Sequence, residues 1–359
     1  MNILSRYLIR NVCIGFAASA GLLIPLFTTF NLINELDDVT PGGYQWTQAL
    51  LVVLMTLPRS LIDLGPFIAL LGGIVGLGQL SKSLELTAIR TAGVSIFRIA
   101  LIILSAGLFM TVLSGAFDEW VASPLQQRAV EIKNNALAKA DDSADAGNNL
   151  WARSNNEFIT VKYLDEHSQP VGIEILNYNS NLSLDSYIYA EKGTMMKKGI
   201  WILHDVTIKK WSDGQETLKK YDDFQWRSVF ADINLKDLTL PAESFSVRQL
   251  HNYIGYLQST GQPNREFRSA LWQKLGRPIL ILAMILLAIP FTFSAPRAPG
   301  LASRLAVGVI IGLLTYITYQ IILNLGLLFS LNVQLTTLAP PSLLLLLSLV
   351  LVYRFDQRH

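Results

Sequence analysis

The chain has 359 residues, of which 51% are hydrophobic and 16% charged, and its mean hydropathy is +0.37. Soluble proteins carry about 25% charged residues, so this composition indicates a membrane protein. A formal net charge of +2 is too small to indicate nucleic-acid binding. The single cysteine, Cys13, excludes an intrachain disulfide.

Three long apolar segments occupy the first third of the chain. About 20 consecutive apolar residues let a helix cross the bilayer, because each backbone polar group must then bond within its own segment. The second segment is too long for one straight span and contains Pro58 and Pro66. We therefore expect an interfacial helix up to Leu57 and a span over about residues 61–80. The three segments cover residues 12–36, 46–80 and 96–121.

Residues 123–267 contain no segment suited to crossing a membrane, and their pattern is mostly β. Apolar and polar residues alternate with a period of two, as in half-buried strands. Asp213-Gly214 favours a tight hairpin turn, and Ser246 is suited to cap a helix over residues 246–261. Several short strands of this spacing predict a sandwich or jelly roll. The predicted strands cover residues 158–164, 171–178, 183–190 and 200–211.

Three further apolar segments follow, at residues 271–293, 305–329 and 338–353. If all six segments cross the membrane, the basic residues of the short loops fall on one side, which marks the cytoplasm. Both chain termini are then cytoplasmic, and the β domain lies outside. We therefore predict an α+β membrane protein of six transmembrane helices, arranged 3+3 around the inserted domain. The predicted divisions are residues 1–122, 123–267 and 268–359. The basic residues are Arg6, Arg10, Lys82, Arg90, Arg98, Arg297, Arg304, Arg354 and Arg358.

The sequence contains no recognisable catalytic constellation. Its four histidines are scattered and form no HExxH motif. Gly78 lies four residues before Lys82, so Lys82-Ser83 does not complete a Walker A loop. We expect no metal and no cofactor, and any ATP that drives this protein is hydrolysed by another chain.

Residues 83–95 form a short amphipathic loop segment between the second and third predicted spans. One interpretation is a solvated loop helix. The other is a coupling helix that docks into a groove of an ATPase, where a carboxylate in the first turn suits an arginine of the partner. The residues assigned to coupling are Glu85, Leu84, Ile89 and Arg90, with Ala88 and Ala92 on the apolar face of Leu84 and Ile89.

Glycines reduce the thickness of two predicted spans. Gly72 and Gly76 lie in the second span, and Gly308 and Gly312 lie in the fifth. Small residues at this spacing let helices approach closely. The pattern is compatible with packing within one chain and with a seam between subunits.

Four basic residues lie near the outer ends of the second and fourth predicted spans. Charge inside a membrane is expensive and usually faces a cavity or a partner, although a side chain near a helix end can also reach the headgroups. Four bases at one level favour an anion site, such as one for a lipid phosphate. Asp63, one turn from Arg59, is an alternative ion-pair partner. The four residues are Arg59, Arg268, Lys274 and Arg277.

Short motifs, each different, are spread along nearly the whole chain. In order they are Arg6-Tyr7, Pro58-Arg59, Leu77-Gly78, Glu85 with Gly93, Glu119-Trp120-Val121-Ala122, Leu150-Trp151-Ala152, Leu250-His251-Asn252-Tyr253, Ser259-x-Gly261-Gln262, Pro296-Arg297 and Gly300 to Arg304. Each is weak alone, but their order and the 3+3 arrangement are specific together. With these features the chain resembles the LptF/LptG permease family of the lipopolysaccharide-export ABC transporter, and most closely its LptG branch.

The resemblance implies a permease subunit that extracts lipopolysaccharide from the inner membrane and is not itself an enzyme. It implies a heterodimer with an LptF-type paralogue, a cytoplasmic LptB-type ATPase dimer and a single-span LptC-type protein. The β domain is then a periplasmic jelly roll that passes the lipid to a periplasmic bridge, and Glu85 carries the coupling contact. Apolar candidates for the lipid cavity in spans one, two and five are Phe27, Phe30, Phe67, Tyr316 and Tyr319.

The outer end of the first span departs from the family pattern. Some family members carry lysines there, aligned with phosphate, whereas this chain has Asn31, Glu35, Asp37 and Asp38. We therefore assign phosphate recognition to Arg59 and the bases of the fourth span.

Two other classes of function remain alternatives. Lipoprotein-release permeases have four spans with the extra domain after the first, whereas here the domain follows the third. A membrane-anchored β domain could also act as a binding scaffold that moves nothing. A lipid-modifying enzyme is disfavoured by the missing histidine and metal clusters.

Overall fold

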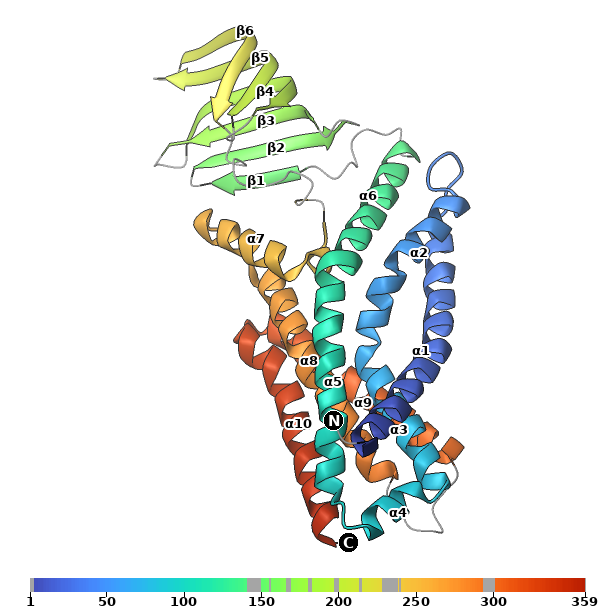
Figure 1. Cartoon of the computed structure of the whole chain (residues 1–359). Coiled ribbons are helices and arrows are strands. Elements are labelled where there is room, and N and C mark those ends of the chain that lie inside the picture. The colour runs from blue at the N-terminus through green and yellow to red at the C-terminus, as the bar shows by residue number, and fades with distance from the viewer. Residues whose placement is uncertain are drawn as a thin grey trace. The chain divides into compact units, whose positions relative to one another are not determined.

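The chain forms two compact units, coloured by residue number in Figure 1. The helical unit comprises Met1–Val39, Gln45–Lys133 and Arg268–His359, and the β unit comprises Thr40–Tyr44 and Asn134–Phe267. The computed structural model describes residues 3–140, 150–154, 156–165, 169–179, 183–196, 200–212, 215–227, 238, 240–292 and 301–358.

Five helices of the described chain are long and apolar enough to cross a membrane, in agreement with five of the six predicted spans. The second predicted span is a pair of helices bent by 61°, which gives a sixth candidate if the pair is one broken span. The five are α1 (Ile3–Asp37), α5 (Ile96–Phe117) with its continuation α6 (Ser123–Ala140), α8 (Arg265–Thr292), α9 (Leu301–Leu328) and α10 (Val333–Arg358), and the bent pair is α2 (Trp46–Asp63) and α3 (Gly65–Lys82).

The bend lies at Leu64, so the predicted helix end at Leu57 was wrong. Pro58 lies inside α2, which continues to Asp63. Pro66 occupies the first turn of α3, where its missing N–H costs no intrahelical hydrogen bond and its fixed φ suits the start of a helix. The new helix therefore begins just ahead of Pro66, and Pro58 does not end the old one.

The third predicted span continues well beyond residue 121. α5 runs without a loop through a π-helical turn at Asp118–Ala122 into α6, which reaches Ala140 (Figure 1). The polar residues of α6 had indicated the start of a separate domain. An amphipathic helix can nevertheless extend an apolar one, because backbone hydrogen bonds do not depend on side-chain polarity.

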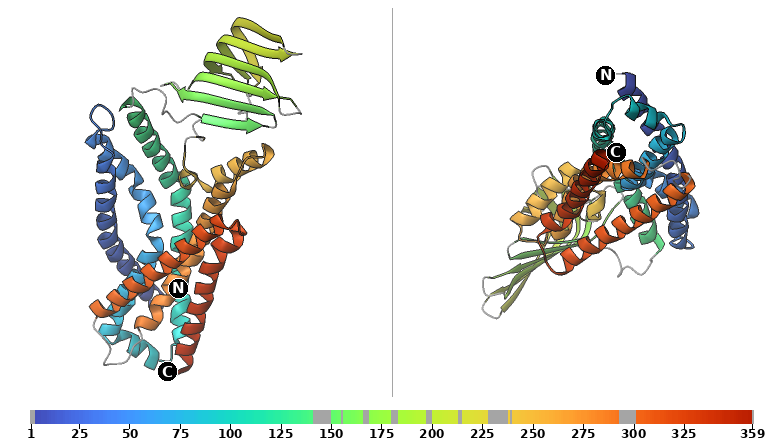
Figure 2. Two further views of the ribbon diagram at one scale, coloured as in Figure 1. Left: turned by 180° about the vertical axis from the view of Figure 1, so that it is seen from behind. Right: turned by 90° about the horizontal axis from the view of Figure 1, so that it is seen from below.

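Glycines bring α1 and α9 close to α3. A methyl group at Gly15 would lie 2.2 Å from the carbonyl oxygen of Gly72, and one at Gly76 would lie 2.6 Å from that of Asn11. On the α9 side, a methyl group at Gly308 would lie 2.5 Å from Ile74. A methyl group at Gly312 would lie 3.2 Å from Phe67. All of these contacts lie within one chain, and Figure 2 shows α9 running obliquely across the helices with α10 beside it.

In the described residues the β unit contains one six-stranded antiparallel sheet whose strands follow sequence order. Alternate residues share one buried face; across β2 and β3, for example, Ile159 faces Ile175 and Val161 faces Ile173. A jelly roll needs strands that change between two sheets, so its closure stays a prediction. The strands are β1 (Leu150–Ser154), β2 (Glu157–Leu164), β3 (Pro170–Tyr178), β4 (Leu184–Met195), β5 (Ile200–Ser212) and β6 (Gln215–Arg227).

β5 and β6 pair antiparallel as far as Ser212 and Gln215, and the turn predicted at Asp213-Gly214 lies outside the described residues. The helix start predicted at Ser246 is confirmed. α7 (Val247–Ser259) begins after Ser246, whose hydroxyl accepts a hydrogen bond from the backbone of Gln249.

Candidate functional site

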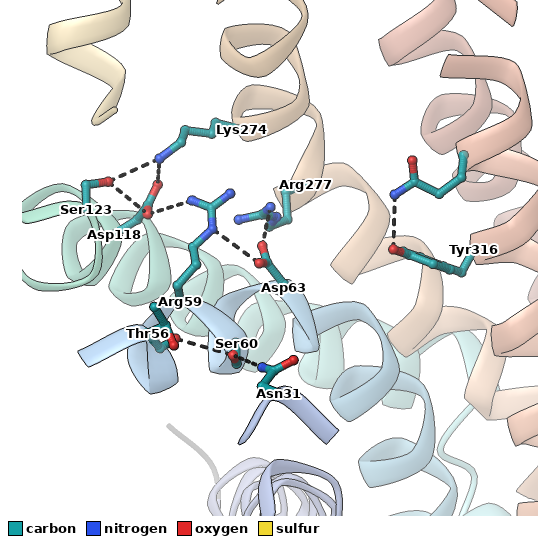
Figure 3. Close-up of polar contacts among 11 residues, drawn as sticks. Asn31, Thr56, Arg59, Ser60, Asp63, Asp118, Ser123, Lys274, Arg277 and Tyr316 are labelled. Carbon is teal, nitrogen blue, oxygen red and sulfur yellow. Dashed lines mark hydrogen bonds and ion pairs between the residues drawn. The ribbon is translucent and has the colours of Figure 1, made fainter. Parts of the chain in front are cut away.

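Arg59 lies at the centre of a cluster of charges inside the helical unit (Figure 3). Its Nε lies 3.2 Å from Asp63 Oδ2, one turn along α2, which confirms Asp63 as an ion-pair partner. Its Nη1 lies 3.2 Å from Asp118 Oδ1 in the π-helical turn. Arg59 is only 8% exposed, and a buried charge requires such partners.

The π-helical turn brings Asp118 and Ser123 to the same basic residue. Lys274 Nζ on α8 lies 2.6 Å from Asp118 Oδ2 and 3.2 Å from Ser123 Oγ. In an α-helix, residues five apart lie about 140° apart around the axis. The wider turn, with its bond from Ser123 N–H to Asp118 O, places them together.

Arg277 completes the cluster one turn further along α8. Its Nη2 lies 2.6 Å from Asp63 Oδ1, so Asp63 bridges two arginines. Three cations and two carboxylates leave one net positive charge. Arg268 takes no part in these contacts. We call Arg59, Asp63, Asp118, Ser123, Lys274 and Arg277 the charged network.

A small cavity of about 30 Å³ adjoins the charged network. Asp118, Lys274 and Arg277 line it together with Thr111, Ser114 and Gly115 of α5 and with apolar residues of α2 and α8. Such a volume suits one or two water molecules and is too small for a sugar phosphate or an acyl chain. In this conformation carboxylates hold all three bases.

The predicted coupling segment, residues 83–95, contains one short helix, α4 (Glu85–Thr91). Leu84 precedes it with a φ of 60° and is 66% exposed. Leu86 is buried, and Ile89 packs against the core of the helical unit. The predicted apolar face is thus divided, because Ala88 and Ala92 stay exposed with Leu84 while Ile89 faces inward.

Glu85 accepts hydrogen bonds on both carboxylate oxygens. The Tyr7 hydroxyl of α1 donates to Oε2 at 2.5 Å, and the Ser83 hydroxyl donates to Oε1 at 2.8 Å. The bond from Tyr7, and after it the bond from Ser83, lower the pKa of Glu85 below its ordinary value. Glu85 is therefore a fixed anion that is only partly exposed, whereas Arg90 lies at the other end of α4.

The far end of the coupling segment is held by α10. Asp356 accepts a hydrogen bond from the backbone N–H of Ile96 at 2.8 Å, and Ser95 accepts one from that of Arg98 at 3.2 Å. These carboxylate and hydroxyl groups satisfy N–H groups that the first turn of α5 leaves unpaired. α1 and α10 thus hold opposite ends of the coupling segment.

The candidate lipid-lining aromatics are divided between two helix surfaces. Phe27 and Phe30 are exposed on α1. On the other surface, Phe67 of α3 packs on Tyr316 of α9 with ring centroids 5.7 Å apart. The Tyr319 hydroxyl donates to the carbonyl oxygen of Thr337 at 3.4 Å. The structure therefore joins Phe67 and Tyr316 and leaves the α1 aromatics apart from them.

Sequence reasoning missed two charged partners, Asp118 and Lys133. Asp118 carries the charged network, and its signal was a carboxylate at the end of an otherwise apolar segment. The acidic end of α1 also has a partner, because Lys133 of α6 lies 2.9 Å from Glu35 and 2.7 Å from Asp38. Among the residues that the structure describes, no group of three or more His, Cys, Asp or Glu could hold a metal ion.

Comparison with known proteins covers nearly the entire chain. The family model for "Lipopolysaccharide export system permease LptF/LptG" matches residues 6–354. The lipopolysaccharide export system permease protein LptG of Escherichia coli K12 is 26% identical over 358 residues, 98% of each chain. LptG of Haemophilus influenzae is 24% identical over 323 residues, 90% of each chain.

Proposed function

Because this chain belongs to the lipopolysaccharide export system permease LptF/LptG family, we propose that it forms half of a heterodimeric permease with an LptF-type paralogue. It extracts lipopolysaccharide from the inner membrane and passes it to a periplasmic bridge. An LptB-type ATPase dimer hydrolyses ATP on the cytoplasmic side, and a single-span LptC-type protein associates at the flank. The β unit is periplasmic and closes as a jelly roll.

The observation that carries this proposal is the exposure of α1 and α9. Within its most apolar stretch, only 22% of α1 and 11% of α9 is buried, compared with 56% of α8. Both helices pack against α3 and present apolar side chains outward. Such surfaces suit lipid acyl chains or a second subunit. We propose that they line the lipid cavity, with Phe27, Phe30, Phe67, Tyr316 and Tyr319 among the contacts.

The basic residues of α2 and α8 supply phosphate recognition. Asp63 and Asp118 compensate Arg59, Lys274 and Arg277 in this conformation. A lipid phosphate competes for these cations when the helices separate, because phosphate is also a strong acceptor for arginine and lysine. Arg268 lies outside the charged network and can contact phosphate without that exchange.

Glu85 transmits the closing motion of the ATPases. A partly exposed, fixed carboxylate on α4 offers an arginine of the partner a charge-assisted hydrogen bond, and the exposed Leu84 adds apolar contact. Closing of the ATPases then compresses the cavity and moves the lipid outward. Each lipid CH₂ removed from an apolar environment costs roughly 0.8 kcal/mol, so several acyl chains require staged input of ATP.

Glu85→Ala tests the coupling role. In the complete complex we expect lipopolysaccharide release to fall at least about tenfold, as for loss of one good charged contact, while the helical unit stays folded. The control is Glu191→Ala, which removes an exposed carboxylate from β4. Normal ATPase association and normal release in Glu85→Ala would contradict the proposal.

Arg268→Glu tests phosphate recognition without disturbing the charged network. The amount of lipopolysaccharide that copurifies with the complex should fall, and mass spectrometry of the bound lipid measures it. A scaffold that moves no lipid predicts an unchanged amount. That result, together with normal folding, would remove Arg268 from the proposed site.

A further inference from the structure

Tyr7 is a part of the Arg6-Tyr7 motif to which the proposed function gives no role. It lies near the start of α1, far in sequence from the coupling segment. Its hydroxyl nevertheless donates to Glu85 Oε2 at 2.5 Å. Tyr7 is 41% exposed, so the contact forms at the surface of the helical unit and not within its core.

We propose that Tyr7 is a positioning residue that holds the Glu85 carboxylate and ties α4 to α1. This inference rests on the proposed coupling role of Glu85. With Tyr7 on one oxygen and Ser83 on the other, the carboxylate stays in one orientation before a partner arrives. It keeps acceptor capacity, because an ionised carboxylate has about four lone-pair sites.

α1 is suited to carry motion away from this contact. Between Tyr7 and Phe27 the helix covers about 30 Å at 1.5 Å per residue, and Phe27 belongs to the exposed surface assigned to lipid. Near its middle, Gly15 packs against the backbone of α3, where a methyl group would meet the carbonyl oxygen of Gly72 at 2.2 Å. A displacement of α4 therefore moves one end of a helix that is closely packed near its middle.

α4 also has direct connections to α3 and α5 through the chain. The turn at Leu84 (φ 60°) joins it to α3, and the turn at Gly93 (φ 88°) leads to α5. The Tyr7 hydrogen bond adds α1, which no short loop connects to α4. Three helices thus follow the position of one short cytoplasmic helix.

The test is Tyr7→Phe in the complete complex, reconstituted with purified lipopolysaccharide and a periplasmic acceptor. Lipid released per ATP hydrolysed should fall about threefold to tenfold, the effect of one charge-assisted hydrogen bond at an exposed site. A variant that merely folds less well lowers both rates in proportion and leaves this ratio unchanged. Tyr353→Phe is the matched control, because within the described chain the Tyr353 hydroxyl accepts a hydrogen bond from Gln357 of the same helix.

A double-mutant cycle separates this inference from the coupling role of Glu85. Once Glu85→Ala has removed the carboxylate that Tyr7 contacts, Tyr7→Phe should lower the ratio no further. Ser83→Ala should also lower the lipid released per ATP hydrolysed, because Ser83, at the end of α3 and not on α1, holds the other oxygen of Glu85. An unchanged ratio in Tyr7→Phe beside a defective Glu85→Ala overturns the role of Tyr7 and leaves the coupling role intact. Normal release in both variants overturns both.

Discussion

The two ends of α5 carry polar contacts of opposite kinds. At its first residue lies the coupling segment, where Tyr7, Ser83 and Glu85 form hydrogen bonds at the surface. At its last turn lies the charged network, where Asp118 and Lys274 pair in the interior. α5 has 22 residues, so about 33 Å separates these ends.

The hydrogen bonds at the coupling segment and the ion pairs of the charged network differ in how easily they can be exchanged. An exposed hydrogen bond contributes little to folding, so it can be exchanged for a contact with a partner. A buried ion pair contributes little net stability when complete, but removing one member leaves a charge without compensation. The coupling end is therefore suited to switching, and the network end is suited to holding α2, α5 and α8 in one arrangement.

Asp118→Asn should have the largest effect. It leaves Arg59 and Lys274 without the carboxylate that both contact, at a cost of about 3–5 kcal/mol. Thermal unfolding of the purified protein in lipid nanodiscs measures the loss. Asp63→Asn is the control, because the Asp63 side chain is 47% exposed and its replacement should cost about 1 kcal/mol. Equal losses would show that burial does not distinguish the two carboxylates.

Gly15→Ala should have the next largest effect, since Gly15 is where α1 packs closely on α3. The new methyl group would meet the Gly72 carbonyl oxygen at 2.2 Å, and the forced backbone shift costs about 1–3 kcal/mol. Gly21→Ala on the same helix has no heavy atom within 4 Å and should not destabilise the protein. Identical melting temperatures for the two variants would mean that α1 does not pack on α3 at Gly15.

A smaller effect concerns the pH dependence of Glu85. Because hydrogen bonds lower its pKa in the folded protein, the folded state binds fewer protons than the unfolded state near the ordinary value of 4.5. The Tyr7–Glu85 contact therefore contributes fully to the stability of the fold above pH 4.5. That contribution is lost as the pH falls through the pKa of Glu85 in the folded protein. Tyr7→Phe should raise the pKa of Glu85, measured by carbon-13 NMR of its carboxyl group. An unshifted titration would contradict the hydrogen bond.

The smallest expected effect is the pH dependence that comes from Glu157 in the β unit, which has the opposite sign to that from Glu85. Burial raises the pKa of Glu157 in β2, although the Trp226 indole donates to Glu157 Oε1 at 3.1 Å. The folded state therefore binds more protons, and stability falls as the pH rises from 4.5 through the folded pKa. Glu157→Gln keeps an acceptor for Trp226 and should slightly raise the melting temperature at neutral pH. The same change at the exposed Glu191 should leave it unaltered.

Local patterns predicted the elements whose causes are local. Apolar length located five spans, and Ser246 located the start of α7 because its hydroxyl caps the next turn. The period of two located β2, β3, β4 and β5. The sequence predicted the break between α2 and α3 at the wrong residue. Pro58 and Pro66 were both possible break points, and only Pro66 lies at the start of a helix.

The candidate site was predictable only in part. The bases Arg59, Lys274 and Arg277 were identified by their cost inside a membrane, and the structure brings them together while leaving Arg268 apart. Asp118 was missed, because the residues next to it in the sequence do not predict the π-helical turn that directs its side chain toward α8. Glu85 was identified, but its partner Tyr7 lies 78 residues away in the chain.

The sequence alone determined which segments can enter a bilayer and which form strands, because hydropathy and side-chain period act over a few neighbouring residues. Tertiary structure alone decided which charges neutralise one another and which helix holds Glu85. Those pairings depend on helix rotation and crossing, which glycine contacts and one π-helical turn set across distant parts of the chain.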